Sequence, residues 1–280
     1  MAGLNACLGF LLAAAALGAS ARALLGLRPG GRFSQELPAS FVLVASRLET
    51  QTLMEVGQWA GGFGADVAAT VLFVVLAVHG AVYRYATGNT CVTIMEYLLC
   101  REGALSVLAS LAAHFLGAWL AQLFAQYYWS LELSDMHMIR NLMMQACSPT
   151  LRASVYQGAF TEGVCALGFH LLYLSTRRAP ATFRVPVVAL ALAFLSYAAS
   201  DYTSGLINPS LAYALTFHCP GFTLLEYTTV FWLAPLAGMA VALFLHCGHI
   251  PRLFSRNLLY SQKTRFRVPT EEKIKAGKVK

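Results

Sequence analysis

Charged residues are scarce in this sequence. Only 12% of its 280 residues are Asp, Glu, Lys or Arg, whereas 58% are hydrophobic. Soluble domains usually contain about 25% charged residues. The composition therefore excludes a soluble enzyme or a soluble binding domain, and it predicts an integral membrane protein that crosses the bilayer several times.

Catalytic and metal-binding patterns are missing as well. The seven cysteines include no CxxC pair, which argues against both a disulfide framework and a zinc site. The sequence contains no recognisable set of nucleophile, base and orienting residue, and no glycine-rich phosphate loop. We therefore expect no cofactor, no bound metal and no enzymatic activity.

Positive charge is concentrated at the C-terminal end. Residues 251–280 contain nine Lys or Arg and two Glu, so this segment carries the whole net charge of +7. Nucleic-acid binding would be one explanation, but a basic segment beside a hydrophobic body is typical of a cytoplasmic flank. We expect residues 249–280 to form a cytoplasmic tail, and we expect no nucleic-acid partner.

Seven stretches are long and apolar enough to cross a bilayer, which requires about 20 mainly apolar residues. They are Leu4–Leu27, Ala39–Gly61, Asp66–Tyr83, Gly103–Tyr127, Ser154–Ser175, Phe183–Ala199 and Tyr227–Cys247. Two further apolar pieces, Thr90–Leu99 and Pro209–Phe217, are too short to cross. Short helices at membrane depth must line a cavity or be buried in protein, because lipid cannot satisfy their free backbone groups. The two short pieces therefore point to a path for a solute.

The first two stretches leave a choice of topology. Ala39–Gly61 contains Arg47 and two glutamates, but it must span the membrane if the positive loops are to face the cytoplasm. This favours seven spans, with residues 1–34 forming an additional N-terminal helix and its basic flank, which includes Arg28. Leu4–Leu27 could instead be the first of six spans or a cleaved signal peptide, although no basic region precedes it.

The order of the pieces repeats along the chain. Two spans, a short helix and a third span occur in residues 35–128 and again in residues 154–248, and a loop at residues 129–153 joins them. An odd number of spans inverts the second copy, so the two short helices enter from opposite faces and meet near the midplane. The sequence thus predicts an all-α fold with a six-helix core and two re-entrant half-helices.

Several motifs carry a family resemblance, in the order and at the spacing of that family. Residues 89–91, Asn-Thr-Cys, and residues 208–210, Asn-Pro-Ser, resemble the two Asn-Pro-Ala boxes of aquaporins, the first in a degenerate form. Residues 114–118 are similar to the Gln-x-x-Gly-Ala pattern of the third core helix, and residues 231–238 to the pattern of the last. Together with residues 256–263, they resemble the unorthodox, or super-aquaporin, branch of the major intrinsic protein family.

The resemblance implies a function, a location and an assembly. It implies a homotetrameric channel for water and small neutral solutes, such as glycerol or hydrogen peroxide, in the endoplasmic reticulum or in secretory vesicles. Two alternatives stay open. One is an aquaporin homologue with a degenerate pore and a structural role, and the other is an ion-coupled transporter, which the small number of intramembrane carboxylates disfavours.

The expected pore residues follow from the two boxes. The N-terminus of a short helix carries free N–H groups and about half a positive charge, so two facing ends repel cations and protons. The Asn amides offer hydrogen-bond donors to a passing water. The resemblance further implies that Glu162, and more weakly Glu49, brace the loops as acceptors. The expected pore residues are Asn89, Thr90, Cys91, Asn208, Pro209 and Ser210.

Departures from the family pattern fall at the first box and at the expected selectivity filter. Thr90 replaces a Pro that is preorganised for the first helical position, and we expect a looser loop as a result. Leu211 stands where water-selective aquaporins carry a pore Arg, and Ser196 and Gly205 are the other filter candidates. We therefore expect a filter without a charged residue.

Overall fold

The structure is a computed structural model, and it describes residues 2–26, 31–61, 63–84, 86–143 and 149–247. All regular elements in these ranges are helical. Arg28 and the basic tail at residues 249–280 lie outside the described residues. The helices are α1 (Ala2–Gly26), α2 (Arg32–Val56), α3 (Ala65–Val82), α4 (Thr90–Leu98), α5 (Ala104–Ser130), α6 (Asp135–Met143), α7 (Val155–Ser175), α8 (Ala181–Ala198), α9 (Pro209–Thr216), α10 (Leu224–Thr228) and α11 (Ala234–His246).

Five of the described helical segments are long and apolar enough to cross a membrane. They are Gly3–Gly26, Ala65–Val82, Ala104–Ser130, Ala181–Ala198 and Leu224–His246, the last of which joins α10 and α11 through a π-helical turn. With 25 and 21 residues, α2 and α7 are long enough as well. These two helices carry the buried charged side chains Arg47 and Glu162.

The start of α2 differs from the sequence-based expectation. The expected span began at Ala39, directly after Pro38, whereas the helix begins at Arg32 and includes Pro38. Proline inside a helix removes one backbone hydrogen bond, and its ring clashes with the carbonyl four residues earlier. Helices in membrane proteins tolerate it because neighbouring groups satisfy the freed carbonyl. The added turns place Glu36 inside the bundle, where it is 4% exposed.

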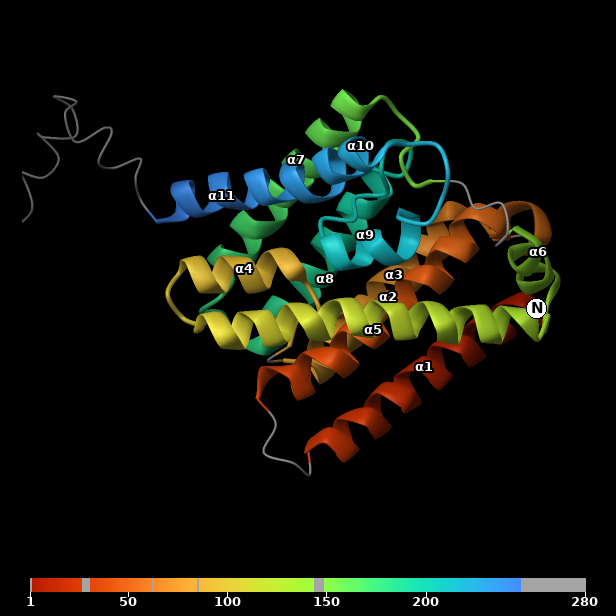
Figure 1. Cartoon of the computed structure of the whole chain (residues 1–280). Coiled ribbons are helices and arrows are strands. Elements are labelled where there is room, and N and C mark those ends of the chain that lie inside the picture. Colours follow the sequence, from red (N-terminus) through yellow and green to blue (C-terminus); the bar gives the residue numbers. More distant parts are fainter. Residues whose placement is uncertain (1, 27–30, 62, 85, 144–148, 248–280) are drawn as a thin grey trace, which may run out of the picture.

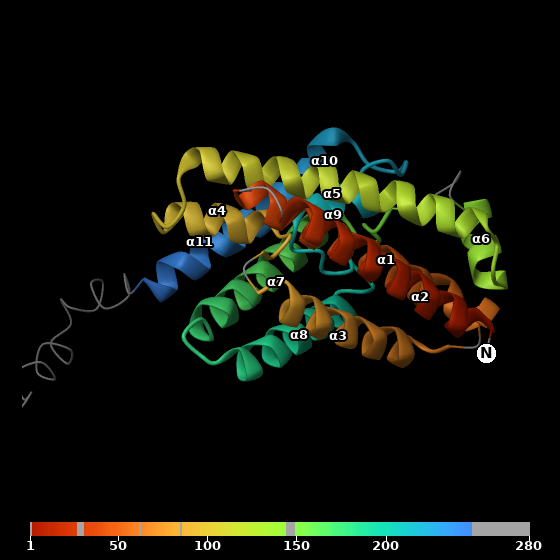
Figure 2. The same ribbon diagram turned by 90° about the horizontal axis from the view of Figure 1, so that it is seen from below.

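The helices of the two halves pack in matching pairs. α2 packs along α5, α7 along α11, and α3 against α8 (Figures 1 and 2). Glycines allow the first two crossings: a Cβ on Gly117 would lie 2.9 Å from the Leu37 oxygen, and one on Gly238 would lie 2.2 Å from the Gly163 oxygen. Small residues at such crossings let the helix backbones approach closely.

Helix α1 lies outside these pairs, packed along α2 (Figure 2), and its side chains contact α5. Phe10 is fully buried and contacts the rings of Phe124 and Tyr128, and the Tyr128 hydroxyl donates to the Ala6 carbonyl oxygen at 3.1 Å. The N-terminal end of α1 and the C-terminal end of α11 lie at opposite ends of the bundle (Figure 1).

The short helices α4 and α9 each follow a loop with a glycine of positive φ. Gly88 has φ 62° and Gly205 has φ 56°, a left-handed conformation that glycine adopts without steric cost. A Cβ would also lie 3.0 Å from Ser40 Cα at the first position and 2.9 Å from the Leu195 oxygen at the second. Both loops are therefore packed directly against a long helix of the bundle.

Candidate functional site

The N-termini of α4 and α9 meet inside the bundle, and each is capped by an Asn side chain. Asn89 Oδ1 accepts from the backbone N–H groups of Cys91 at 2.9 Å and Val92 at 3.2 Å. Asn208 Oδ1 accepts from Ser210 N at 3.3 Å and from Ser210 Oγ at 2.9 Å. Asn is well suited to this position, because its side-chain oxygen satisfies N–H groups that the helix leaves free.

Asn208 also joins the two loops directly. Its Oδ1 accepts from the backbone N–H of Thr90 at 3.0 Å, and its Nδ2 donates to the Gly88 carbonyl oxygen at 2.9 Å. A Pro at position 90 has no N–H and could not make the first bond. Against the expected loosening of this loop, Thr90 thus supplies a hydrogen bond between the two boxes that Pro could not make.

Glu162 holds the loop before the second box. Its two carboxylate oxygens accept from Leu206 N at 2.9 Å and Ile207 N at 2.8 Å, and its side chain is fully buried. Ile207 has φ 54°, which is unusual for a β-branched residue. Such a conformation costs on the order of 1–3 kcal/mol and persists only where neighbouring groups hold it. The paired bonds from Glu162 supply that restraint.

The first box is held by Glu36, which the sequence analysis did not identify. Glu36 Oε2 accepts from the backbone N–H of Gly88 at 3.0 Å and contacts His114 Nε2 at 3.0 Å. The other ring nitrogen of His114 lies 3.5 Å from Thr90 Oγ1. All of these groups are buried.

Glu49, the expected brace of the first loop, lies elsewhere. Its carboxylate contacts Trp129 Nε1 at 2.9 Å and His137 Nε2 at 2.8 Å, near α6. It therefore fastens α6 and the end of α5 to α2 and does not contact the first box. Glu36 and Glu49 are 13 positions apart on α2, so they lie at different ends of the same helix.

A cavity of about 40 Å³ lies beside the two boxes. This is above the roughly 10–15 Å³ that one water needs. The expected filter residues Ser196, Gly205 and Leu211 all line it, together with Asn89 and Asn208. The remaining expected pore residues do not line this cavity but are buried at the starts of α4 and α9; they are Thr90, Cys91, Pro209 and Ser210. The other lining residues are Leu43, Arg47, Leu76, Leu192 and Leu206.

Arg47 is a charged lining residue of this cavity that the sequence analysis did not identify. It is 6% exposed, and its Nη2 donates to the Ser204 carbonyl oxygen at 3.4 Å. The expected filter residues thus share their cavity with a guanidinium from α2, a charge that the sequence analysis did not place there. Helical spacing carried the signal: Glu36, Ser40, Leu43 and Arg47 are separated by four, three and four positions and share one face of α2.

Two larger cavities lie away from the meeting point of the boxes. One of about 290 Å³ has five arginines and three glutamates among its lining residues, including Glu36. There Arg32 donates a hydrogen bond to Glu102 in the loop between α4 and α5, and this contact lowers the pKa of the Glu102 carboxyl. This cavity is therefore a charged vestibule that reaches the loop of the first box.

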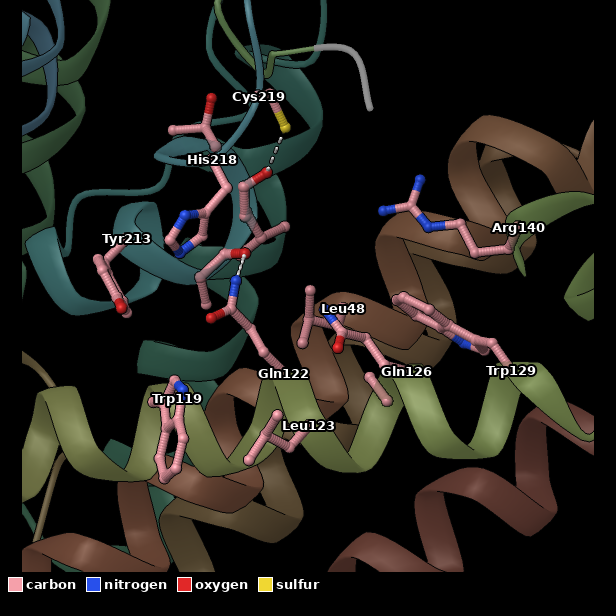
Figure 3. Close-up of a pocket in the computed structure, with 14 residues that line it drawn as sticks. Leu48, Trp119, Gln122, Leu123, Gln126, Trp129, Arg140, Tyr213, His218 and Cys219 are labelled. Atoms are coloured by element: carbon pink, nitrogen blue, oxygen red, sulfur yellow. Dashed lines mark hydrogen bonds between the residues drawn. The ribbon is translucent and has the colours of Figure 1, made fainter. Parts of the chain in front are cut away.

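The other large cavity, of about 360 Å³, lies between α5 and α9 and contains neither Asn (Figure 3). Gln122 points from α5 toward α9 and donates to the Ala214 carbonyl oxygen at 2.7 Å (Figure 3). Cys219 at its edge is disulfide-bonded, which the cysteine spacing did not predict. Within the described ranges, no three His, Cys, Asp or Glu side chains form a candidate metal site.

The fold and the site together define a class of protein: a multi-pass membrane channel built around two opposed re-entrant helices. The structure resembles that of the aquaglyceroporin from Plasmodium falciparum, with a TM-score of 0.59 and 13% identity, over 79% of this chain and 97% of that one. No family model matches the sequence.

The chain belongs to the aquaporin family, in its aquaporin-12-like branch. It is 43% identical over 283 residues to aquaporin-12 of Mus musculus, covering 100% of this chain and 97% of that protein. It is 25% identical over 190 residues to aquaporin-11 of Homo sapiens, covering 68% of this chain and 69% of the relative. Its membership identifies it as a channel protein and not an enzyme.

Proposed function

We propose that this channel conducts water and small neutral solutes along the path between α4 and α9. The observation that carries the proposal is the contact of the two helix N-termini, which Asn208 links through Thr90 and Gly88. Both helix ends present partial positive charge to the same point, and this arrangement opposes cations and protons. Asn89 Nδ2 has no hydrogen-bond partner among the described residues and is available to donate to a passing oxygen.

The lining of the cavity favours the passage of neutral solutes. Leu211, Leu76 and Leu192 give it apolar walls, and Ser196 is small, with its hydroxyl donating to the Ser204 carbonyl oxygen at 2.9 Å. Water and hydrogen peroxide are close in size and hydrogen bonding, so both fit this site. Glycerol is larger, and its passage requires the leucine side chains to move aside from a cavity of about 40 Å³.

The proposal includes a location and an assembly. We infer a homotetramer in intracellular membranes, either the endoplasmic reticulum or secretory vesicles, with the C-terminal tail in the cytoplasm. Aquaporin-12 and aquaporin-11 relatives support this assignment. Residues 35–128 and 154–248 act as two repeats in this proposal, with residues 1–34 forming an accessory helix and residues 129–153 the connection. The matching pairs α2 with α5 and α7 with α11 support the division.

A structural role without conduction is the second candidate. The small volume of the cavity and the engagement of Asn208 by Thr90 and Gly88 favour it, because both restrict a passing solute. In a variant of this idea, Leu211 closes the path as an apolar plug, since hydrophobic constrictions can gate by dewetting.

Flux through purified protein in proteoliposomes separates these candidates. Water, glycerol and peroxide are measured by stopped-flow for wild type, Leu211→Arg and Leu211→Ala. We expect wild-type flux of water and peroxide above empty vesicles, measurable glycerol flux, and a loss of glycerol flux in Leu211→Arg. Flux only in Leu211→Ala would favour the plug, and no flux in any folded variant would favour the structural role.

A further inference from the structure

Arg47 is a buried charge in the core of a membrane protein. It lies on α2 with 6% of its surface exposed, and its one hydrogen bond within the described residues is the 3.4 Å contact with the Ser204 carbonyl oxygen. A guanidinium has five N–H donors, and burying it without partners is costly. Ionisable groups at membrane depth are rare for this reason, and those that occur usually line a functional path.

The charge of Arg47 is not neutralised by a direct ion pair. Among the described residues, no carboxylate oxygen lies within salt-bridge distance of its guanidinium. Glu162 acts on it electrostatically. However, both oxygens of Glu162 already accept backbone N–H groups of the second-box loop, at 2.9 and 2.8 Å. The positive charge is therefore available to the cavity that Arg47 lines.

Arg47 lies next to the two Asn boxes. It lines the cavity of about 40 Å³ that also contacts Asn89, Asn208 and Leu211. Leu43, four positions earlier on α2, lines the same cavity, which places this face of the helix along it. Leu211 enters from α9, so the arginine and the leucine reach the cavity from two different helices.

We propose that Arg47 is the charged selectivity residue of this channel, taking from α2 the role that an arginine at position 211 has in water-selective aquaporins. The inference rests on the proposed conduction path. In a site shielded from bulk water, a unit positive charge adds to the partial positive charges of two helix ends. Cations and protons are then repelled at the boxes, while the guanidinium N–H groups donate to the oxygen of a neutral solute.

The test removes the charge and then returns it at the other position. Proteoliposomes contain wild type, Arg47→Gln, Arg47→Lys or the double variant Arg47→Gln with Leu211→Arg. Water flux and proton leak are measured in each, the leak with a pH dye inside the vesicles. Arg22→Gln is the matched control, because Arg22 is an exposed arginine on α1 that is bonded to the Val82 carbonyl oxygen. Gel filtration and helical circular dichroism verify folding.

We expect Arg47→Gln to raise the proton leak about tenfold or more, because it removes a unit charge from a poorly solvated path. Arg47→Lys should keep the leak at the wild-type level because it retains the charge, and the double variant should return the leak to that level. The control Arg22→Gln should match wild type. An unchanged leak in a folded, water-conducting Arg47→Gln overturns the inference and leaves the proposed function intact.

The experiment also distinguishes the inference from the proposed function. Water flux that appears only in Arg47→Gln would show that Arg47 closes the path, which overturns the selectivity role. Absence of water flux from wild type and from every folded variant would overturn both the inference and the proposed function. If Arg47→Gln does not fold, Arg47→Lys still tests the inference, because it retains the charge and most of the side-chain volume. A raised leak in Arg47→Lys would overturn the role of the charge.

Discussion

Replacing Glu162 by Gln tests how the second box is held in place. The fully buried carboxylate accepts from the backbone N–H groups of Leu206 and Ile207 at 2.9 and 2.8 Å. A Gln side chain offers one oxygen and one NH₂ group, so one of these N–H groups loses its acceptor and faces a donor. Leaving a buried donor unpaired costs about 1–3 kcal/mol, and more when the lost acceptor was charged.

Part of this loss is offset, because a neutral amide is less costly to bury than a carboxylate. We therefore expect a net loss of about 2 kcal/mol in the free energy of unfolding. At roughly 2–4 °C per kcal/mol, this lowers Tm by about 4–8 °C. Water flux should fall as well, since the freed N–H belongs to the strained loop at Ile207 that leads into Asn208.

The assay is thermal unfolding of detergent-solubilised protein, followed by stopped-flow water flux in proteoliposomes. Glu132→Gln is the matched control: Glu132 is exposed and accepts from Asn141 Nδ2 at 2.9 Å. We expect the control to behave like wild type, because exposed polar contacts contribute little. A folded Glu162→Gln with unchanged Tm and unchanged water flux would refute the view that this carboxylate positions the second box.

Three further predictions address the first box, the helix crossing and the topology. Thr90→Pro removes the N–H group that donates to Asn208 Oδ1. We expect the free energy of unfolding, measured chemically or thermally, to fall by about 1 kcal/mol and the proton leak to increase. Stability and leak equal to those of wild type would contradict the role of this bond. Gly238→Leu adds a side chain where even a Cβ would clash with the Gly163 oxygen, so we expect little folded protein by gel filtration. Gly168→Leu is the control and should fold normally, because a Cβ there would meet nothing within 4 Å. A tag before α1 should be lumenal and a tag after residue 280 cytoplasmic by protease protection; protection of both on the same side would contradict the seven-span topology.

The sequence predicted most helices well, because apolar runs and turn residues are local signals. Each expected span has a matching helix, and both short helices begin at the predicted residues Thr90 and Pro209. The glycine before each box is also explained locally, because Gly88 and Gly205 both adopt a positive φ. The family membership followed from short motifs whose order and spacing are fixed.

The partners of the buried charges could not be predicted in the same way. Glu36 and Gly88 are 52 positions apart, and Arg47 and Ser204 are 157 positions apart, so these contacts exist only after the bundle has formed. The family resemblance implies that Glu49 braces a loop, but a carboxylate within a span does not by itself indicate which loop its side chain reaches. Glu36 lies on the same face of α2 as Arg47, but on the other side of Pro38, where a helix usually ends.

The effect of Thr90 in place of Pro could not be predicted from the local sequence either. Considered alone, the loss of Pro predicts a looser first turn, since Pro is preorganised there. In the structure its backbone N–H bonds to Asn208, and its hydroxyl lies 3.5 Å from His114 Nδ1. The meaning of the substitution depends on residues 24 and 118 positions away, which no local pattern contains.

We propose that water crosses between the opposed ends of α4 and α9 while charge is rejected there. The most direct test measures osmotic water flux and proton leak in the same proteoliposomes for wild type and Asn208→Asp. We expect wild-type water flux above empty vesicles with no added proton leak. We expect a raised leak in Asn208→Asp, because a carboxylate between two positive helix ends weakens the barrier to cations. Wild-type water flux equal to that of empty vesicles, or an identical leak in a folded Asn208→Asp, would contradict it.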